Sequence, residues 1–391
     1  MKVAVFISHP IQYYSPIFSD LSKRCDLDVF YLTDLTPSDH AKAGFGTEFT
    51  WDIDLLSSHR HRFLTDGGIR KRELGTVFRF SEVFNALSVG RYNAVLVIGW
   101  YLPGLRQAIL AAKILGVPVI VRGDSHLGTE RRNLKRWGQS LIYPLLCRTF
   151  NGAVYPGQKN KAYFQHYNYP QERLFSSPHC IDTHRFDEGA TPTARTTLRA
   201  RHGIGPEEKV VLFAGKLLPF KRPLDVIDAL GVLKSRGQKL RLMVAGSGPL
   251  EADVRRRGEQ LGVDMTFLGF QNQSEMPVAY AASDVLVLPS ASETWGLVCN
   301  EALASGLPIV VSDQIGCAPD LAADNHVGRM YPMADIAALA DAITATLANP
   351  PSPQEIKRVS DAHSILKACD GIMSALAFAI SAKRVSRSGA I

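Results

Sequence analysis

The sequence lacks the cysteine patterns that indicate a zinc site or a disulfide framework. It has six cysteines among 391 residues, and no two of them form a Cys-x-x-Cys pair. Their positions are Cys25, Cys147, Cys180, Cys299, Cys317 and Cys369. Scattered cysteines in a chain of this size are typical of a reduced, cytoplasmic protein. We therefore expect free thiols and a cytoplasmic location.

Long apolar runs are also absent, so the sequence predicts no membrane span. A spanning helix needs about 18 or more consecutive apolar residues, and no such stretch occurs. The N-terminal run 1–7 is too short for a signal peptide and is followed by His9 and Pro10. The nearest candidate, 371–382, is too short to cross a bilayer and is expected to pack as a terminal helix.

The net charge of +7 is moderate, and no nucleic-acid-binding motif accompanies it. Basic residues cluster at 59–62, 70–72 and 131–136. Such clusters can meet phosphates, anionic lipid or nucleic acid, or they can lie in solvent on loops and helix faces. No aromatic residues alternate with them as in a base-stacking platform. We expect no nucleic-acid partner, and at most a peripheral contact with the anionic inner face of the cell membrane.

Short apolar runs alternate with helical patterns in both halves of the chain. Strands are expected at 3–8, 27–32, 94–98, 117–121, 152–155, 209–214, 240–245, 265–268, 284–288 and 308–311. Helices are expected near 14–24, 104–115, 131–148, 222–236, 249–261, 274–282 and 298–305. This alternation is typical of parallel sheets covered on both faces. The sequence therefore predicts an α/β protein with two Rossmann-like, doubly wound domains facing a cleft.

The expected domain boundaries follow from a change in composition. Residues 187–206 are polar, rich in Thr, Arg and Gly, and lack a strand pattern, as in a linker. We expect a first domain at 1–186 and a second at 207–365. Residues 366–391 are expected to form a C-terminal helix that packs back on the first domain.

Two glutamates, Glu293 and Glu301, are the most informative pair of residues. They lie eight positions apart, on either side of Gly296, where a strand pattern gives way to a helical one. Eight helical residues span roughly 12 Å, about the reach of an extended nucleotide-sugar. The N–H groups at a helix start would suit a diphosphate between them. The alternative is a solvated Glu293 and a Glu301 that supports the first helical turn.

Ligands of doubly wound domains bind beyond the carboxyl ends of the strands. The loops that follow the expected strands carry unusual residues at 9–14, 100–101, 122–126, 215–221, 246–248, 269–270 and 293–296. Together with the two glutamates, these loops predict a ligand site in each domain.

The order and spacing of these motifs resemble the GT-B fold retaining glycosyltransferases called glycosyltransferase family 4, or glycosyl transferases group 1. The resemblance is strongest over 208–315. It rests on Phe213-Ala-Gly-Lys-Leu-Leu-Pro-Phe-Lys-Arg-Pro223, Val244-Ala-Gly-Ser-Gly-Pro-Leu250, Phe267-Leu-Gly-Phe270 and the Glu-x7-Glu segment. Ser177-Pro-His-Cys-Ile-Asp-Thr-His-Arg-Phe186 resembles the family's hinge-side segment, and the N-terminal half matches only in outline.

The resemblance implies roles for donor-site residues. Lys216 and Lys221 match the basic pair that binds the donor diphosphate, although the family more often has Arg where Lys216 stands. Glu301 matches the glutamate that accepts hydrogen bonds from the ribose. Glu293 matches the one that contacts the sugar near the reacting carbon. The remaining donor-binding positions are Gly215, Gly269, Phe270, Gly296, Leu297 and Val298.

The first domain departs further from the family. Where many relatives have a glycine pair, this chain has Pro10, flanked by His9, Gln12 and Tyr13, which we expect to contact the acceptor. Relatives place a histidine near the transferred sugar in the loop that here contains Arg122, Asp124 and His126. Which of these three serves the reaction stays open. Asp124 could take the acceptor's proton, His126 could contact the sugar, and Arg122 could bind the acceptor.

The resemblance implies neither a resident cofactor nor an essential metal. Two Asp-x-Asp sequences, 26–28 and 52–54, spell the pattern by which another transferase fold binds manganese. Both lie far in sequence from the donor motifs, and we interpret them as structural. The expected donor is a nucleotide-sugar, with a UDP-sugar favoured.

The resemblance therefore predicts a retaining glycosyltransferase of polysaccharide biosynthesis. It would move a sugar from a nucleotide-sugar to a hydroxyl of a glycan or a lipid-linked acceptor. Two other hypotheses stay open at this point. One is a nucleotide-sugar epimerase of the same fold, and the other is a non-catalytic nucleotide-sugar-binding protein.

Overall fold

The computed structural model describes residues 1–41, 47–64, 80–128, 143–323 and 327–388. The chain forms two compact units. Unit 1 comprises Met1–Leu35, Asp54–His179 and Ile365–Ile391, and unit 2 comprises Thr36–Ile53 and Cys180–Ser364. The chain therefore passes from one unit to the other four times. The basic clusters at 70–72 and 131–136, and most of the helix expected at 131–148, lie outside the described residues.

Unit 1 is built on a seven-stranded sheet in the order β3-β2-β1-β4-β5-β6-β7. Its strands are β1 (Lys2–Ile7), β2 (Asp26–Tyr31), β3 (His61–Phe63), β4 (Ala94–Ile98), β5 (Val119–Arg122), β6 (Gly152–Tyr155) and β7 (Leu174–Ser176). All neighbours pair in parallel. Every residue of β4 is buried, as expected for a central strand covered on both faces.

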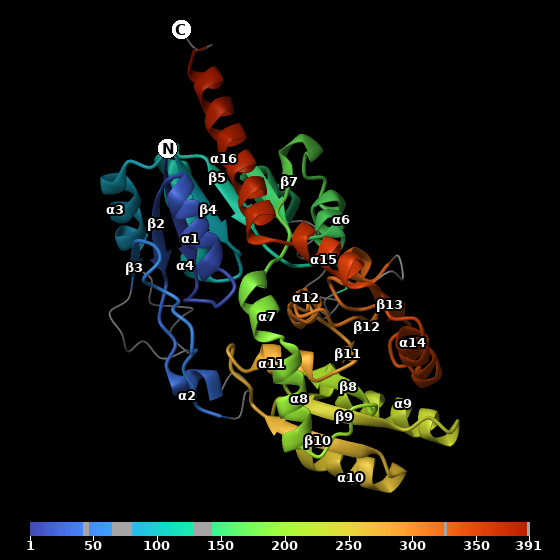
Figure 1. Ribbon diagram of the computed structural model, residues 1–391. Coiled ribbons are helices and arrows are strands. Elements are labelled where there is room, and N and C mark those ends of the chain that lie inside the picture. Colours follow the sequence, from blue (N-terminus) through green and yellow to red (C-terminus); the bar gives the residue numbers. More distant parts are fainter. Residues whose placement is uncertain (42–46, 65–79, 129–142, 324–326, 389–391) are drawn as a thin grey trace. The chain divides into compact units, whose positions relative to one another are not determined.

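Helices cover both faces of this sheet (Figure 1). They are α1 (Ser15–Arg24), α3 (Phe80–Gly90), α4 (Pro103–Ile114), α6 (Gln158–His166), the 3-10 turn Gln171–Arg173 and α16 (Ile365–Ser388). The last helix, α16, lies against α1, β6 and β7. The helix α16 therefore belongs to the same unit as the N-terminal strand β1.

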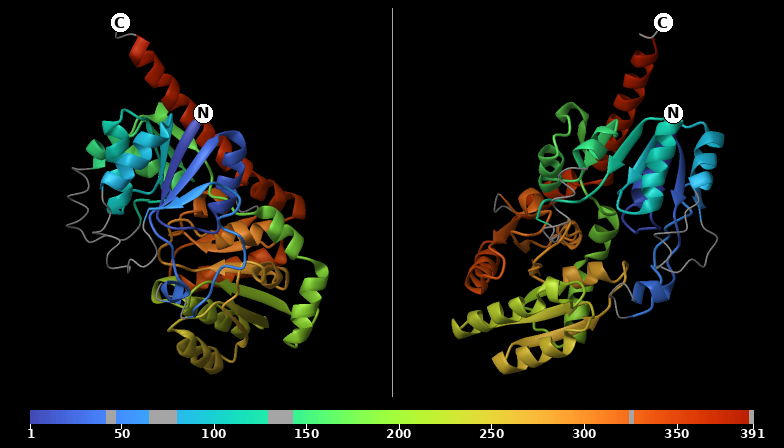
Figure 2. Two further views of the ribbon diagram at one scale, coloured as in Figure 1. Left: turned by 90° about the vertical axis from the view of Figure 1, so that its left-hand side faces the viewer. Right: turned by 180° about the vertical axis from the view of Figure 1, so that it is seen from behind.

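Unit 2 is built on a six-stranded parallel sheet in the order β10-β9-β8-β11-β12-β13. Its strands are β8 (Lys209–Ala214), β9 (Leu240–Ala245), β10 (Asp264–Gly269), β11 (Val285–Leu288), β12 (Ile309–Ser312) and β13 (Gly328–Tyr331). Its helices are α2 (Pro37–His40), α7 (Thr183–Gly189), α8 (Pro192–Arg201), the 3-10 turn Pro219–Lys221, α9 (Pro223–Ser235), α10 (Glu251–Leu261), α11 (Met276–Ala281), α12 (Val298–Ala304), α13 (Ala318–Leu321), α14 (Ile336–Ala348) and α15 (Pro353–Ala362). Figure 2 shows the same elements from two further sides.

The predicted fold class of two Rossmann-like parallel sheets is confirmed. The expected strands missed three members, namely β3, β7 and β13. Each of these lies at the edge of its sheet and has three or four residues. Edge strands are covered less completely than central ones, so they need no continuous apolar run. Residues 187–206, expected as a linker, hold α8 and the end of α7.

Both sheets have the strand order of a doubly wound fold, which reverses direction at one point. The reversal lies between β1 and β4 in unit 1 and between β8 and β11 in unit 2. Loops that leave two such neighbouring strands turn to opposite sides and leave a crevice at the carboxyl edge. This topology brings residues 8–14 toward 99–101, and residues 215–221 toward 289–296.

Among the described residues, the helical stretch Pro353–Lys383 is long and apolar enough to cross a membrane, judged by length and composition alone. It contains α15 and most of α16, and 39% of its most apolar segment is buried. The α16 part packs against α1, β6 and β7 of unit 1. A helix that covers a sheet in this way also passes such a test, so the finding is weak evidence for a membrane span.

Gly371 provides a test of the packing of α16. A Cβ atom at this position would overlap the backbone carbonyl oxygen of Ser176 in β7. Alanine favours an isolated helix over glycine by about 1 kcal/mol, yet we expect Gly371→Ala to lower the free energy of unfolding by about 1–3 kcal/mol through overpacking. Denaturant titration measures the change. Ser374→Ala, on the exposed side of the same helix, should have little effect, and equal stability of both variants would contradict this packing.

Candidate functional site

The loops after β8 and β11 meet through an ion pair in unit 2. The Lys221 ammonium donates to Oε1 of Glu293, and both side chains are largely buried, with 17% and 15% exposed. The same carboxylate oxygen accepts a hydrogen bond of 3.0 Å from the Ser290 hydroxyl. Two residues that are 72 positions apart therefore lie together at the point where the strand order reverses.

Backbone contacts hold the Glu293 loop in place. Gly316 N–H donates to the Glu293 carbonyl oxygen (3.1 Å), and the Ser312 hydroxyl donates to the Ser290 carbonyl oxygen (2.6 Å). A Cβ at Gly316 would overlap the carbonyl of Thr294. The loop after β12 thus fixes the backbone on which the Glu293 carboxylate is carried.

The turn into α12 requires glycine. Gly296 has φ +101°, a conformation that other residues adopt rarely, and it leads to the N-cap residue Leu297 and to Val298 at the first helical position. No side chain caps this helix start. These three predicted donor-site residues lie directly after the Glu293 loop.

The two glycines at 246 and 248 allow a close backbone contact. A Cβ at Gly246 would overlap the Gly215 carbonyl oxygen, and one at Gly248 would press on the backbone of Leu217. The two loops after β8 and β9 therefore approach one another by backbone. Gly215 (φ +147°) and the partly buried Lys216 lie on the β8 side of this contact.

Glu301 belongs to α12, and its buried carboxyl group has two hydrogen-bond donors beside it. Its carboxylate accepts a 2.7 Å hydrogen bond from the Tyr280 hydroxyl and a further one from the Gln273 side chain. Gln273 in turn accepts from Arg185 (2.9 Å). Burial raises the pKa of Glu301 to about 7, although the two hydrogen bonds and the Arg185 charge favour the ionised form.

The predicted base-docking residues lie at the end of β10 and directly after it. Gly269 has φ +71° and open space where a Cβ would lie, and Phe270 is partly buried. The ring of Phe270 contacts the ring of Phe49 with centroids 4.2 Å apart. Phe49 belongs to the segment Thr36–Ile53 of unit 2, which the sequence pattern did not connect with the donor site.

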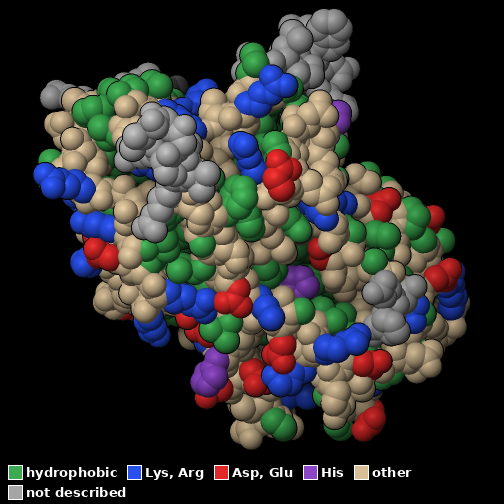
Figure 3. All heavy atoms as spheres, turned by 90° about the horizontal axis from the view of Figure 1, so that it is seen from above, with side chains coloured by type: hydrophobic (Ala, Val, Ile, Leu, Met, Phe, Trp, Pro, Cys, Tyr) green, Lys and Arg blue, Asp and Glu red, His purple; other side chains and the backbone are tan. Residues whose placement is uncertain are grey.

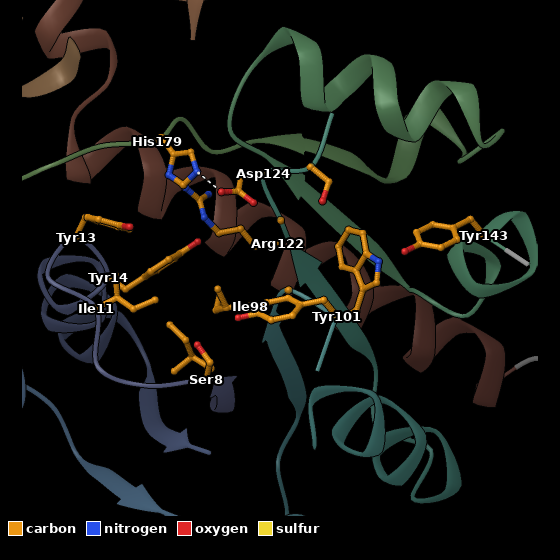
Figure 4. Close-up of a pocket in the computed structure, with 15 residues that line it drawn as sticks. Ser8, Ile11, Tyr13, Tyr14, Ile98, Tyr101, Arg122, Asp124, Tyr143 and His179 are labelled. Carbon is orange, nitrogen blue, oxygen red and sulfur yellow. Dashed lines mark ion pairs between the residues drawn. The ribbon is translucent and has the colours of Figure 1, made fainter. Parts of the chain in front are cut away.

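Unit 1 has a pocket of about 190 Å³ at its own reversal point (Figure 4). It is lined by Ile7, Ser8, Ile11, Tyr13, Tyr14, Ile98, Gly99, Trp100, Tyr101, Arg122, Gly123, Asp124, Ser125, Tyr143 and His179. In Figure 4, Asp124, Arg122 and His179 lie together, with Tyr13 and Tyr143 on opposite flanks. Loops after β1, β4 and β5 supply most of this wall, as a crevice at the carboxyl edge requires.

The structure separates the predicted acceptor residues into two groups. Tyr13, Arg122 and Asp124 line the pocket, whereas His9, Gln12 and His126 do not belong to its wall. His9 contacts the Ser8 hydroxyl through Nδ1 (2.9 Å). His126 is 4% exposed, and its Nδ1 accepts from the Gly128 N–H (3.1 Å). Gln12 is partly buried.

Arg122 is fully buried, and its guanidinium donates to the segment that follows β7. Its guanidinium donates to the carbonyl oxygen (2.7 Å) and hydroxyl of Ser177 and to the Pro178 carbonyl oxygen (3.2 Å). The Ser177 hydroxyl donates to the carbonyl of Ala368 in α16 (2.7 Å). Arg122 therefore ties the end of β5 to the segment after β7, and through Ser177 to α16.

Asp124 is the acidic residue among those that line the pocket. Its side chain is 44% exposed, and its Oδ2 lies 3.9 Å from Nε2 of His179. Burial, assisted by the nearby Arg122 charge, lowers the pKa of His179 well below its usual range. His179 is consequently neutral near pH 7, so Asp124 faces a neutral imidazole.

Several residues of these sites have no recognisable sequence signal. Tyr280 and Gln273 contact Glu301 from α11 and the loop before it, and Ser290 contacts Glu293. Trp100 and Tyr101 belong to a loop that the sequence pattern singled out after a predicted strand, but no role was assigned to them. His179 lies in the segment that resembles the family's hinge side, which was not assigned to a pocket.

The two Asp-x-Asp sequences make protein contacts. Asp26 and Asp28 pair with the Arg60 guanidinium. Asp52 accepts from the Ser274 N–H (3.1 Å) and hydroxyl, and Asp54 accepts from the N–H groups of 56 and 57 (3.0 Å each). No cluster of three or more His, Cys, Asp or Glu side chains suited to a metal occurs among the described residues.

The raised pKa of Glu301 predicts a pH dependence of stability. The folded protein holds the proton more tightly than the unfolded chain, whose carboxyl has its usual pKa of 4.5. The contribution of Glu301 is fully present below pH 4.5 and is lost as the pH rises through about 7, by an amount on the order of 3 kcal/mol. Denaturant titrations at several pH values should show this loss of unfolding free energy in the wild type and not in Glu301→Gln.

The exposed Glu259 in α10 provides the control. Glu259→Gln should follow the wild-type pH profile. A wild-type profile in Glu301→Gln would contradict the buried, proton-binding carboxyl.

Comparisons with known proteins agree with this geometry. Residues 194–361 match the family described as Glycosyl transferases group 1. The D-inositol 3-phosphate glycosyltransferase of Corynebacterium glutamicum is 32% identical over 205 residues, 50% of this chain and 48% of the relative. A GDP-mannose-dependent alpha-(1-6)-phosphatidylinositol monomannoside mannosyltransferase of Mycolicibacterium smegmatis is 32% identical over 190 residues, 46% of this chain and 49% of the relative. The aligned part thus spans about half the length of these relatives.

Solved structures extend the likeness to the whole chain. HepE from Anabaena in complex with UDP superimposes with a TM-score of 0.73 at 17% identity, over 96% of this chain and 100% of that one. A glycosyltransferase from Rickettsia africae gives a TM-score of 0.66 at 12% identity, over 97% and 96%. Residues 194–361 therefore carry a glycosyl transferases group 1 domain, within a chain that has the GT-B fold throughout.

Proposed function

We propose that this protein is a retaining glycosyltransferase of family 4. It would move a sugar from a nucleotide-sugar to a hydroxyl of a glycan or a lipid-linked acceptor. The observation that carries the proposal is the contact between Lys221 and Glu293 at the reversal point of the unit 2 sheet. This contact lies inside the segment that matches glycosyl transferases group 1.

The proposed donor is a nucleoside diphosphate sugar, with a UDP-sugar favoured. HepE was solved with UDP-glucose, while one curated relative is named as GDP-mannose-dependent. In this chain Lys216 and Lys221 would bind the diphosphate, Glu301 the ribose, and Gly269 with Phe270 the base. The N–H groups of Leu297 and Val298 would face the phosphates, with Gly296 and Gly215 giving close approach.

The proposed chemistry depends on charge at the leaving group. Cleavage of the glycosidic bond places negative charge on the nucleoside diphosphate, and the two fixed lysines stabilise that charge in the transition state. Glu293 would hold the sugar hydroxyls. Its ion pair with Lys221 orients both groups before the donor arrives. The lysines supply the charge role that a metal would otherwise serve, so we propose that no metal is essential.

The proposed acceptor site is the pocket of unit 1. Its aromatic lining, which includes Tyr13 and Tyr101, suits the apolar face of a sugar ring. Among the three candidates in the loop after β5, Asp124 has the exposed carboxylate, whereas Arg122 and His126 are buried. We therefore assign proton removal from the acceptor hydroxyl to Asp124.

Polysaccharide assembly at the inner face of the cell membrane is the proposed setting. Exposed apolar side chains on α3 and α4 include Val89 (84%), Leu110 (54%) and Ile114 (60%), with Arg106 and Lys113 exposed on α4. In Figure 3 hydrophobic side chains gather in one part of the face, close to Lys and Arg. Such a mixed surface suits anionic lipid. Sedimentation with anionic vesicles, compared with neutral ones, tests this contact.

The activity is tested by incubation with UDP-, GDP- and ADP-sugars, with and without glycan acceptors. Binding of the correct donor raises the thermal midpoint by mass action. Transfer requires the acceptor, whereas an epimerase would convert the donor alone, and a binding protein would leave both unchanged.

The two glutamates should separate binding from chemistry. We expect Glu293→Ala to lower kcat at least about 100-fold and to leave the Kd of the nucleotide within about threefold, because its role lies at the sugar and the bound diphosphate would compensate the Lys221 charge. Glu301→Ala should weaken nucleotide binding about tenfold or more, since it removes the hydrogen-bond acceptor proposed for the ribose and leaves its buried partners unpaired. Steady-state kinetics and calorimetric titration measure both effects. Wild-type turnover in both variants would refute the assignment.

The acceptor loop yields a separate prediction. Asp124→Asn keeps the size of the side chain but removes the base, so kcat should fall about 100-fold or more while the Kd of the nucleotide stays unchanged. Thr294→Ala, in the exposed part of the donor loop, is the control and should retain most activity. Full turnover of Asp124→Asn across the pH range would exclude Asp124 as the base.

A further inference from the structure

The segment between β2 and β3 is divided between the two units. Its residues Thr36–Ile53 belong to unit 2, although strands of unit 1 flank it on both sides in the sequence. The part 47–53, called the strap below, lies along the loop that follows β10. In Figure 1 this blue segment lies beside the orange segment after β10.

Two polar contacts and one ring contact hold the strap on that loop. The Asn272 side-chain amide donates to the Thr50 carbonyl oxygen (2.8 Å). The Asp52 carboxylate accepts from both the N–H and the hydroxyl of Ser274. The centroids of the Phe49 and Phe270 rings are 4.2 Å apart, and the Phe49 ring also makes an edge contact with Trp51, with centroids 4.9 Å apart.

The same short loop supplies the partners of the proposed nucleoside-binding groups. Phe270 begins it, at the place proposed for the base. Gln273 lies between Asn272 and Ser274, which contact the strap. Its side chain is hydrogen-bonded to Glu301, the proposed ribose acceptor. The loop then leads into α11, which carries Tyr280, the other donor to Glu301. Movement of the loop would therefore change the base wall and the ribose carboxylate together.

We propose that the strap is part of the nucleoside-binding side of the donor site. Asp52 and Thr50 are positioning residues that hold the 270–274 loop, and Phe49 extends the Phe270 ring into a wall for the base. The Asp-x-Asp sequence at 52–54 thereby acquires a role other than metal binding. The Asp52 carboxylate accepts a hydrogen bond from Ser274 of unit 2, whereas the Asp54 carboxylate accepts one from Leu56 of unit 1. This inference rests on the proposed nucleotide-sugar function.

Calorimetric titration of the full chain with UDP, GDP, ADP and inorganic diphosphate tests the proposal. For the nucleotide that the wild type prefers, we expect Asp52→Ala and Phe49→Ala to raise Kd about five- to tenfold. Asp52→Asn keeps an acceptor oxygen for Ser274 and should stay within about twofold. Binding of inorganic diphosphate should be unchanged in every variant, because it has no nucleoside.

Two further variants distinguish the loss of the proposed contact from a loss of folding. Asp26→Ala, in the other Asp-x-Asp sequence, should bind like the wild type. Ser274→Ala removes the hydroxyl that donates to Asp52 but keeps the N–H, so it should weaken nucleotide binding in the same direction as Asp52→Ala and by less. The double variant should be no weaker than Asp52→Ala alone, since Asp52→Ala already removes both contacts to Ser274.

The outcomes show separately whether the proposed role of the strap fails and whether the proposed nucleotide-sugar function fails. A wild type that binds no nucleoside diphosphate overturns the proposed function and the strap with it. Unchanged nucleotide affinity in Asp52→Ala and Phe49→Ala overturns the strap alone. Equal weakening of nucleotide and inorganic diphosphate, or an Asp52→Asn variant as weak as Asp52→Ala, would show a general structural effect and also overturns it.

Discussion

The ion pair between Lys221 and Glu293 is the contact on which the candidate donor site depends. Burying two charges costs several kcal/mol for each ion unless they are paired, so neither residue can be removed without leaving an uncompensated partner. The Ser290 hydroxyl and the backbone of the loop after β12 complete the arrangement. Because both side chains are already fixed, little ordering is left for the ligand to induce.

That contact follows from the strand order of the sheet. Lys221 and Glu293 are far apart in sequence, but β8 and β11 are neighbours at the point where the order reverses. The apolar runs of these strands and the helical patterns between them are readable in the sequence, and so the fold class and the loops that carry the donor motifs were predictable. The edge strands β3, β7 and β13 were not, because short strands with mixed residues resemble loops.

The environment of each site residue was less predictable than its presence. No pattern in the sequence indicates that Glu301 is enclosed by Tyr280 and Gln273, since these contacts arise only when α11 packs beside α12. Arg122 was expected to bind the acceptor because it lies in the loop that resembles part of the family's site. It lines the pocket of unit 1, but the sequence does not indicate that burial directs its donors to residues 177 and 178. Likewise, Thr36–Ile53 joins unit 2 through side-chain and ring contacts that a linear reading of domains misses.

The position of α16 has a consequence for the order of folding. This helix covers β6 and β7 of unit 1, yet every residue of unit 2 after Cys180 precedes it in the chain. During synthesis the N-terminal parts of a protein emerge first and begin to fold first. Unit 1 must therefore wait, with part of its sheet uncovered, until the whole of unit 2 has left the ribosome, so the unit that starts first is completed last.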